Sequence, residues 1–405
     1  MPKPKTNPNL RNLHLVVFAY GDRGHTKEYV SNFCSRLHHK YNITLYIGST
    51  SKVEEPEHVN CVYINVDIAK VKAERFLKFG RLSNLFKNLK KQGLIIRYCR
   101  EVLAKKNIQK DDVVYIMDYT APSLFVLFRG LSRIRPKVYL WVHSARFKSK
   151  DLVYSLYKKM VQFILNRLGS KVLSGIVVNG DYIKAQLPGF LDFDADDIHV
   201  IQYPSEIEFS KIDKSEARKQ LGLPKNEDIV LFFGGLRTDK NIEEVVRSTA
   251  MAKNKPLLIV AGSESTVSKQ VLESWLAKHG HENYFLDISY VSEEKMALYY
   301  SASDVMLLTY NSESASQSGP LSLAREFLLP AIVTDAGEIG YYITKNNIGL
   351  VASPDEQDDY TEKVETFFNS DHKARFEKAL QETKQRFSWE NAAAKYHSLF
   401  KSQTT

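Results

Sequence analysis

The stretch from Leu231 to Asn241 reads LFFGGLRTDKN. An apolar run typical of a buried strand ends in two glycines, and two cations three positions apart then lead into a helix that begins at Asn241. Strand, glycine-bearing loop and helix form the repeating unit of a parallel sheet that helices cover on both faces. The stretch therefore predicts an α/β fold.

Other apolar runs of this kind alternate with longer helical patterns along the whole chain. In the first half these runs are Leu13–Tyr20, Ile43–Gly48, Val59–Val66, Val113–Asp118, Val138–His143, Gly175–Asn179 and His199–Tyr203. In the second half they are Ile229–Gly234, Leu257–Gly262, Tyr284–Ile288, Val305–Tyr310, Ala331–Asp335 and Gly349–Ala352. Two such series predict two doubly wound, Rossmann-like domains.

The expected boundary lies at Pro204, where a strand ends and a polar, helix-starting segment follows. Proline fixes the local backbone and suits a hinge point. We predict an N-terminal domain over 1–204, a C-terminal domain over 205–386 and a terminal helix over 387–405. In open α/β sheets ligands bind beyond the carboxyl ends of the strands, so residues just after strands are the candidate site residues.

The composition indicates a globular protein, because 43% of the 405 residues are hydrophobic and 25% are charged. Cys34, Cys61 and Cys99 have neither a disulfide-framework spacing nor a zinc-site spacing, which favours a reducing compartment. The first residues lack the apolar core of a signal peptide, and no stretch approaches the ~20 apolar residues of a spanning helix. We therefore expect a cytoplasmic protein.

The net charge of +9 is unevenly distributed. Residues 1–205 contain 33 Lys and Arg against 17 Asp and Glu, whereas residues 206–405 contain 23 against 30. A basic half favours phosphates, nucleic acid or anionic lipid headgroups. Residues 70–110 hold 13 of these cations, with apolar residues every three or four positions from Phe76 to Leu89. This pattern predicts an amphipathic helix on a membrane surface, although a sheet-covering helix with a solvated outer face gives the same pattern.

Gly235, Arg237 and Lys240 form the strongest candidate binding site. Glycine lets an anion approach the backbone, arginine offers two parallel donors to phosphate oxygens, and lysine adds a point charge. The helix N-terminus that follows adds to the positive field. The spacing predicts a diphosphate clamp, and the alternative is a turn with solvated cations.

A second candidate is the helix start formed by Gln317, Ser318 and Gly319. Backbone N–H groups at Ser318 and Gly319 are suited to hold a phosphate, and Glu326, about two turns along the helix, is suited to hold the hydroxyl pair of a ribose. The alternative is an N-capped helix whose Glu326 lies in solvent or pairs with a base.

The first half offers weaker candidates. His143 ends a strand and is a candidate for contact with a developing negative charge. Gly21 lies in a glycine-bearing loop after the first strand, but this loop lacks the G-x-G-x-x-G of dinucleotide-binding proteins. The segment Asp192–Asp197 contains D-x-D, which we interpret as a solvated turn. No metal site is predicted.

Taken in order, these stretches resemble glycosyltransferase family 4, whose members share the GT-B fold of two Rossmann-like domains facing across a cleft. Phe233–Asn241 carries the resemblance most clearly. The other stretches that agree in order are Val200–Pro204, Val260–Gly262, Tyr290–Lys295, Tyr299–Asp304, Val333–Glu338 and Phe387–Glu390. The resemblance covers essentially the whole second half, whereas in the first half it depends on His143 and the strand pattern.

The resemblance implies a retaining transfer of a hexose from a UDP-sugar or GDP-sugar, with no cofactor and no essential metal. Arg237 and Lys240 would stabilise the leaving diphosphate. His143 would lie near the donor sugar, and Val291 would line the base pocket. The acceptor would be a saccharide or a lipid-linked saccharide at the cytoplasmic leaflet, as in surface polysaccharide or glycolipid synthesis. The terminal helix would cross back onto the first domain.

The chain departs from the family pattern of two glutamates eight residues apart. Counting back from Glu326 gives Ser318, and anchoring on Pro330 instead gives Ala315 and Leu323. At least one glutamate is missing in either register. The loop before the helix resembles that of a subgroup in which the loop backbone holds the donor.

Other function classes stay open. A nucleotide-sugar epimerase on the same fold needs carboxylates around the sugar, and these are sparse near His143. A non-catalytic nucleotide-sugar-binding protein is compatible with the missing glutamate. A nucleic-acid binder would explain the charge, but the sequence shows no recognition helix or aromatic stacking platform, so no nucleic-acid partner is predicted.

Overall fold

The computed structural model describes residues 13–19, 25–48, 57–64, 80–104, 107–143, 152–205, 210–311, 318–356, 358–369 and 372–401. The chain divides into two compact units, one of Met1–Gln202 with Trp389–Thr405 and one of Tyr203–Ser388. The expected divisions, after residues 204 and 386, lie within two residues of these. Each unit is built around one parallel sheet, as the sequence pattern predicts.

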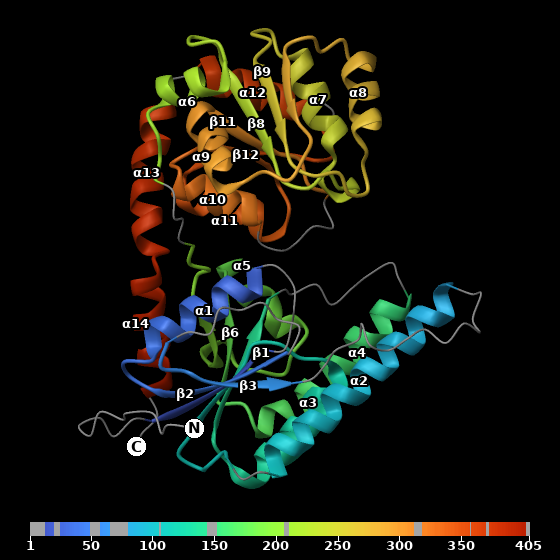
Figure 1. Cartoon of the computed structure of the whole chain (residues 1–405), viewed down its shortest axis with the longest axis vertical. Helices are drawn as coiled ribbons and strands as arrows, with labels where there is room; N and C mark the ends of the chain where they lie inside the picture. The colour runs from blue at the N-terminus through green and yellow to red at the C-terminus, as the bar shows by residue number, and fades with distance from the viewer. Residues whose placement is uncertain are drawn as a thin grey trace. The chain divides into compact units, whose positions relative to one another are not determined.

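The N-terminal unit contains a seven-stranded sheet of order β3-β2-β1-β4-β5-β6-β7 in which all neighbours are parallel (Figure 1). Its strands are β1 (His14–Ala19), β2 (Asn42–Gly48), β3 (Asn60–Ile64), β4 (Val113–Ile116), β5 (Lys137–Val142), β6 (Gly175–Val178) and β7 (Ile198–Val200). The central strands are buried at nearly every position. A strand that is covered on both faces needs apolar residues at successive positions. The sequence therefore shows continuous apolar runs and not alternating apolar and polar residues.

The helices of this unit cover both faces of the sheet. They are α1 (His25–Leu37), α2 (Gly80–Ala104), α3 (Ala121–Ile134), α4 (Leu152–Arg167), α5 (Asp181–Gln186) and α14 (Trp389–Lys401). Alternate strand residues point to opposite faces. Val114 and Ile116 of β4 accordingly share a core with α2, α3 and α4, whereas Tyr115 contacts α1 and α14.

The terminal helix α14 is bound to this unit by buried tyrosines. The hydroxyl of Tyr396 lies 2.7 Å from that of Tyr29 and 2.9 Å from that of Tyr115. The hydroxyl of Tyr139 donates to the carbonyl oxygen of Leu399 at 3.1 Å. Buried hydroxyl groups need such partners because they have lost water. These contacts make residues 389–401 part of the N-terminal core.

The C-terminal unit contains a six-stranded parallel sheet of order β10-β9-β8-β11-β12-β13 (Figure 1). Its strands are β8 (Ile229–Phe233), β9 (Leu257–Ala261), β10 (Tyr284–Asp287), β11 (Val305–Leu308), β12 (Ala331–Thr334) and β13 (Gly349–Ala352). Its helices are α6 (Lys214–Leu221), α7 (Ile242–Met251), α8 (Lys269–Lys278), α9 (Glu293–Ala302), α10 (Gly319–Glu326), α11 (Gly337–Asn346), α12 (Asp359–Asn369) and α13 (His372–Arg386). The helices α7, α8 and α12 share one core with the sheet, and α9, α10 and α11 share the other.

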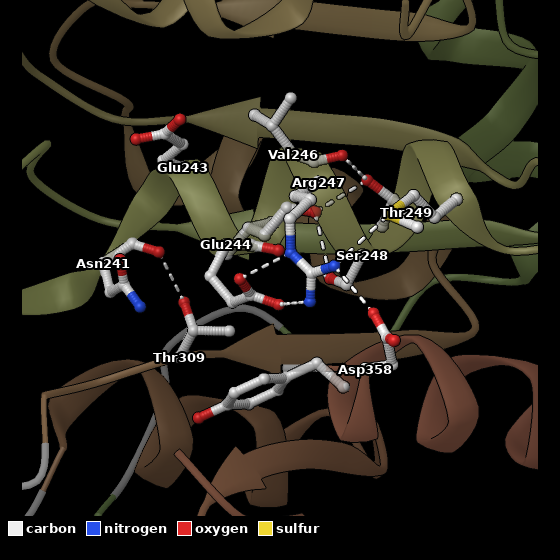
Figure 2. A network of polar contacts seen from close by, with 12 residues as sticks. Asn241, Glu243, Glu244, Val246, Arg247, Ser248, Thr249, Thr309 and Asp358 are labelled. Atoms are coloured by element: carbon white, nitrogen blue, oxygen red, sulfur yellow. Dashed lines mark hydrogen bonds and ion pairs between the residues drawn. The ribbon is translucent and has the colours of Figure 1, made fainter. Parts of the chain in front are cut away.

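An ion-pair network fixes α7, the helix that follows the predicted clamp. Figure 2 shows Arg247 between Glu244 and Asp358. Its guanidinium donates to both carboxylate oxygens of Glu244, at 2.7 and 2.9 Å, and to Asp358 at 3.0 Å. These hydrogen bonds raise the pKa of Arg247 further above its ordinary value. The network joins α7 to the segment that begins α12 and so holds the helix behind the clamp in place.

Candidate functional site

The carboxyl ends of β8 and β9 meet in two glycine turns. Gly234 has a φ of +105° and Gly262 a φ of +148°. A Cβ on Gly262 would lie 2.4 Å from the carbonyl oxygen of Gly234, and a Cβ on Gly234 would lie 2.7 Å from Nζ of Lys240. Both positions require glycine by conformation and by space. A Cβ on Gly235 would meet, within the described chain, only the carbonyl oxygen of Ser263 at 3.8 Å.

Lys240 lies against the first of these turns. Its side chain is buried, and Nζ lies 3.4 Å from the carbonyl oxygen of Phe233 and 5.3 Å from the centre of the Phe232 ring. Burial and, to a smaller extent, the nearby charge of Arg237 lower the pKa of Lys240 to about 8, and Asp239 acts in the opposite direction. A partly desolvated ammonium group gains strongly from an incoming anion. This position therefore suits a phosphate oxygen.

A threonine at the end of β11 holds the backbone of this segment. The hydroxyl of Thr309 lies 2.9 Å from the carbonyl oxygens of both Lys240 and Asn241, and the contact with Asn241 is visible in Figure 2. Asn241 adopts a left-handed conformation with φ +45°, which ends the short turn Thr238–Lys240 and starts α7. Lys240 is thus held between the ends of β8 and β11 and the start of α7.

Arg237, the other cation of the predicted clamp, is exposed and paired with Asp239. Its Nε donates to one carboxylate oxygen of Asp239 at 2.8 Å, and Nη2 donates to the other. This hydrogen bonding lowers the pKa of Asp239 and raises that of Arg237, so both are charged at neutral pH. The guanidinium keeps about half of its side-chain surface in solvent, where a ligand has access to it.

The start of α10 lies beside the same turn. A Cβ on Gly234 would be 3.4 Å from Cγ of Pro320, the second residue of α10. Ser318 caps the helix by accepting from the backbone N–H of Leu321 at 3.4 Å, and its hydroxyl lies 3.0 Å from that of Tyr310. The structure therefore brings Gly235, Arg237 and Lys240 near Ser318 and Gly319, as the order of strands requires.

Glu326 lies at the other end of α10 in a buried network. One of its carboxylate oxygens accepts from Ser205 at 2.8 Å and from Nε of Arg325 at 3.1 Å, and the other lies 3.5 Å from Nζ of Lys384. The guanidinium of Arg325 also lies 4.7 Å from the ring centre of Phe387. Glu326 is therefore paired with basic side chains, as in the alternative considered in the sequence analysis. Its contact with a ribose stays a prediction.

Val291 follows β10 in the segment predicted to line the base pocket. It is half-buried, whereas the neighbouring Tyr290 is 86% exposed. Asp287, the last residue of β10, accepts from the hydroxyl of Tyr299 at 2.6 Å and pairs with Lys295 at 3.3 Å. Against the effect of burial, these bonds and one from Ser289 lower the pKa of Asp287, whereas burial and the bond to Asp287 raise the pKa of Tyr299. The aspartate thus ties the end of β10 to α9.

His143 belongs to the N-terminal unit and directly follows β5. Its ring centre lies 3.8 Å from that of Trp141. Although part of the residue is exposed, the protein packed around the ring lowers the pKa of His143 to about 4, against a hydrogen bond to the Met117 backbone that acts the other way. The imidazole is therefore neutral at pH 7 and suited to hydrogen bonding without carrying a charge.

Two of the predicted site residues, Gly21 and Gln317, lie outside the described residues. Within the described ranges, the acids, histidines and cysteines form no cluster of three or more that is suited to a metal ion. The segments that the structure describes include no helix both long enough and apolar enough to cross a bilayer.

Three features of the site were not singled out in the sequence. They are the pairing of Asp239 with Arg237, the support of the turn by Thr309, and the bond between Asp287 and Tyr299. The only indication in the sequence was the position of Thr309 and Asp287, because both lie at the end of a strand. Such positions are common, and the bonding partners lie far away in the sequence.

Comparison with known proteins finds a family match within the second unit. Residues 213–386 match the family of glycosyl transferases group 1. This match contains the glycine turns, Arg237, Lys240, Val291, α10 and Glu326. No curated protein matches the chain in sequence.

Solved structures match the fold of nearly the whole chain. Sucrose-phosphate synthase from Thermosynechococcus elongatus superposes with a TM-score of 0.72 at 17% identity, covering 96% of this chain and 99% of that one. HepE of Anabaena in complex with UDP gives 0.71 at 15% identity, covering 96% and 100%. The lipopolysaccharide outer core galactosyltransferase WaaB gives 0.68 at 14% identity, covering 97% and 99%. The predicted pair of doubly wound domains, the GT-B fold, is confirmed.

Proposed function

We propose that this chain moves a hexose from a nucleoside-diphosphate sugar to a glycan acceptor with retention of configuration. Its residues 213–386 match the family of glycosyl transferases group 1, so the chain is an enzyme of the glycosyltransferase class. The observation that supports this most directly is the pair of cations beside the β8 glycine turn. Lys240 is buried and lacks full solvation, and Arg237 is exposed beside it. Two such cations match the charge that develops on a leaving diphosphate.

We place UDP ahead of GDP as the nucleotide of the donor. HepE of Anabaena, which shares the fold, has been crystallised with UDP and with UDP-glucose. In this chain the base would lie against Val291 and the exposed Tyr290, and the diphosphate would lie at Gly235, Lys240 and the N-terminus of α10. Backbone N–H groups at Ser318 and Gly319 would complete the binding of the phosphates.

The chemistry assigned to these side chains is charge stabilisation and proton placement. As the bond between the anomeric carbon and the diphosphate breaks, Lys240 and Arg237 take up the negative charge on the leaving oxygen. The acceptor hydroxyl attacks from the same face, and its proton passes to the leaving phosphate. The neutral His143 would hydrogen-bond the donor sugar. In this scheme the two side-chain cations take the place of an essential metal.

The acceptor proposed for this transfer is a saccharide, in the first instance a lipid-linked saccharide of surface polysaccharide or glycolipid synthesis. Lys and Arg outnumber Asp and Glu by 33 to 17 in residues 1–205, which suits an acceptor that carries phosphate or lies in an anionic membrane. We propose that the enzyme works at the inner face of the membrane as a peripheral protein.

Calorimetric titration with UDP and with GDP tests the donor site. UDP should bind the wild type, and Arg237→Ala should weaken binding by about 2 kcal/mol, as for a lost charge-assisted contact. The exposed Lys219 on α6 provides a matched control, Lys219→Ala, whose affinity should equal that of the wild type. Equal affinity of the Arg237 and Lys219 variants would reject the clamp.

Turnover distinguishes the function classes. With a UDP-sugar and an acceptor, the anomeric configuration of the product, read by nuclear magnetic resonance, should equal that of the donor. Inversion would reject the retaining mechanism. Binding without turnover would indicate a nucleotide-sugar-binding protein, and an epimerised donor in the absence of acceptor would indicate an epimerase.

A further inference from the structure

Three helices of the N-terminal unit carry charge of almost one sign. There are six Lys and Arg on α2, two on α3 and three on α4, against the single acid Glu101. Glu101 already pairs with Arg97 on its own helix at 2.9 Å. The helix α3 contacts both α2 and α4, so the three lie next to one another (Figure 1). Among the side chains that the structure describes, the exposed cations of these helices are Arg97 and Arg100 on α2, Arg129 and Arg133 on α3, and Lys159 and Arg167 on α4.

The helix α4 carries two apolar stripes, of which one is exposed and one is buried. Leu156, Met160 and Phe163 are 68%, 43% and 64% exposed, and their spacing of four and three residues places them in one stripe. A second stripe lies in the core of the unit and consists of Val161, Ile164 and Leu165. The described chain covers α4 on one side only.

Cations lie beside this exposed stripe at Phe163. A hollow beside α4 is lined by Lys159, Arg167 and Lys171 together with Phe163. Among the residues that the structure describes, Asp192 is the one acid in its lining. In addition, Arg167 and Lys171 are both exposed, so their charges are available to a partner.

A second hollow, between α2 and α3, has the same character. Arg100, Arg129 and Arg133 line it, and the described lining contains no acid. Phe125 is 44% exposed at this hollow, and the guanidinium of Arg129 lies 5.7 Å from the centre of its ring. Helix α3, the neighbour of α4, thus also presents an exposed apolar side chain among arginines.

We propose that this α3–α4 face, defined by Phe125, Leu156, Met160 and Phe163 with the cations of the two hollows, docks on a bilayer that contains anionic lipid. The four apolar side chains would enter the interfacial layer, and the arginines and lysines would contact headgroup phosphates. The proposal rests on the proposed function for its purpose, the delivery of a lipid-linked acceptor. It assigns a contact to α3 and α4. The stretch from Phe76 to Leu89, which the sequence pattern favours, lies outside the residues whose side chains the structure describes, so its membrane contact stays a prediction.

The charges favour a bilayer over the other occupants. A second copy of the chain would bring two cationic faces together, which like-charge repulsion opposes. Nucleic acid would satisfy the cations, but it offers no apolar layer for Leu156 and Met160. A surface with apolar side chains inside a basic border matches an anionic bilayer in both respects.

Co-sedimentation of the full chain with vesicles tests the proposal. The wild type should bind phosphatidylcholine vesicles that contain phosphatidylglycerol and should not bind pure phosphatidylcholine. The double variant Leu156→Glu/Phe163→Glu should bind at least about tenfold more weakly, because it places charge in the interfacial layer. Val271→Glu, at a 40% exposed apolar position on α8, is the matched control and should bind as the wild type does. Lys159→Gln/Arg167→Gln should weaken binding most at low salt.

Three results would overturn the proposal. They are absence of wild-type binding to phosphatidylglycerol vesicles, undiminished binding of the Leu156/Phe163 variant, and a wild-type dimer that this variant converts to monomer without any change in vesicle binding. The donor site is measured separately by UDP titration, in which the variant should equal the wild type. A chain that binds vesicles but not UDP would keep this proposal and reject the proposed function.

Discussion

Arg237 donates two hydrogen bonds to the carboxylate of Asp239, two residues further along the chain. The exposed cation of the proposed clamp is therefore already partnered before a donor arrives. Any phosphate that binds Arg237 competes with this carboxylate, and its negative charge also adds to that of Asp239.

Removal of the competing charge should tighten donor binding. Asp239→Asn should raise UDP affinity about two- to fivefold, the range of an exposed ion pair of up to about 1 kcal/mol. Calorimetric titration measures this. Weaker binding in Asp239→Asn would mean instead that the carboxylate orients the guanidinium for the ligand.

Donor binding should depend on the protonation of Lys240. Because burial lowers its pKa to about 8, the free enzyme loses the ammonium charge as the pH rises through that value. UDP affinity should then fall with increasing pH, approaching about tenfold per unit. Calorimetry across this range is the measurement, and Lys240→Met should remove the dependence.

The same lowered pKa has an opposite consequence for stability. A lysine with a folded-state pKa below its ordinary 10.5 binds fewer protons in the folded than in the unfolded chain, so its contribution to the free energy of unfolding increases between about pH 8 and 10.5. Urea unfolding of the ligand-free wild type against Lys240→Met isolates this contribution. A difference between the two proteins that does not change with pH would contradict the assigned pKa.

Alanine substitutions at Gly262 and Gly235 should affect different properties, the first the stability of the fold and the second the affinity for UDP. Gly262→Ala places a Cβ 2.4 Å from the carbonyl oxygen of Gly234 at a positive φ, and we expect a loss of at least about 2 kcal/mol in the free energy of unfolding. Gly235→Ala meets no such contact in the described chain and should leave that free energy nearly unchanged while weakening UDP binding. Urea unfolding and calorimetry distinguish them. Unaltered UDP affinity of Gly235→Ala would remove Gly235 from the site.

The hydroxyl of Tyr396 should stabilise the N-terminal unit alone. Tyr396→Phe leaves the buried hydroxyls of Tyr29 and Tyr115 without this partner and should cost about 1–3 kcal/mol. Thermal unfolding should show the loss, while UDP affinity, a property of the other unit, should be unchanged. A fall in UDP affinity below the unfolding transition would contradict this division of roles.

His143→Ala should lower kcat roughly ten- to a hundredfold with UDP affinity unchanged, because the residue would act on the sugar and not on the nucleotide. Since the protein packed around its ring keeps the pKa of His143 near 4, the wild-type activity should show no titration of this histidine between about pH 5 and 8. Steady-state kinetics at several pH values provide the test. Wild-type kcat in the variant would leave the residue with a structural role.

The sequence predicted those features of the fold that local patterns determine. The unbroken apolar runs predicted both parallel sheets, and LFFGGLRTDKN predicted a strand, a glycine turn and a helix where β8 and α7 are found. The predicted neighbourhood of Lys240 and the start of α10 followed from the rule that ligand sites lie at the carboxyl ends of strands.

Other features depend on contacts between distant residues, and no local pattern contains them. The bond between Glu326 and Ser205 joins positions 121 residues apart, so the surroundings of that glutamate could not be read from its own helix. The burial of Lys240 depends on the Phe232 ring and on the turn that follows β8. The exposed stripe of α4 differs from a buried stripe only in what covers it. Side-chain pairing and coverage are set by tertiary packing, which periodicity does not encode.

The assignment of α14 to the N-terminal unit has a consequence for protein engineering. The chain leaves that unit after Gln202 and returns to it at Trp389, so the C-terminal unit is an insertion within a discontinuous N-terminal unit. A single crossover between two such enzymes would combine the N-terminal core of one parent with helix α14 of the other. The tyrosines of that core would then face a helix to which they are not matched. Exchange of residues 203–388 as a cassette, with both junctions cut, keeps each core of one parentage and is the route by which donor specificity should be transplantable.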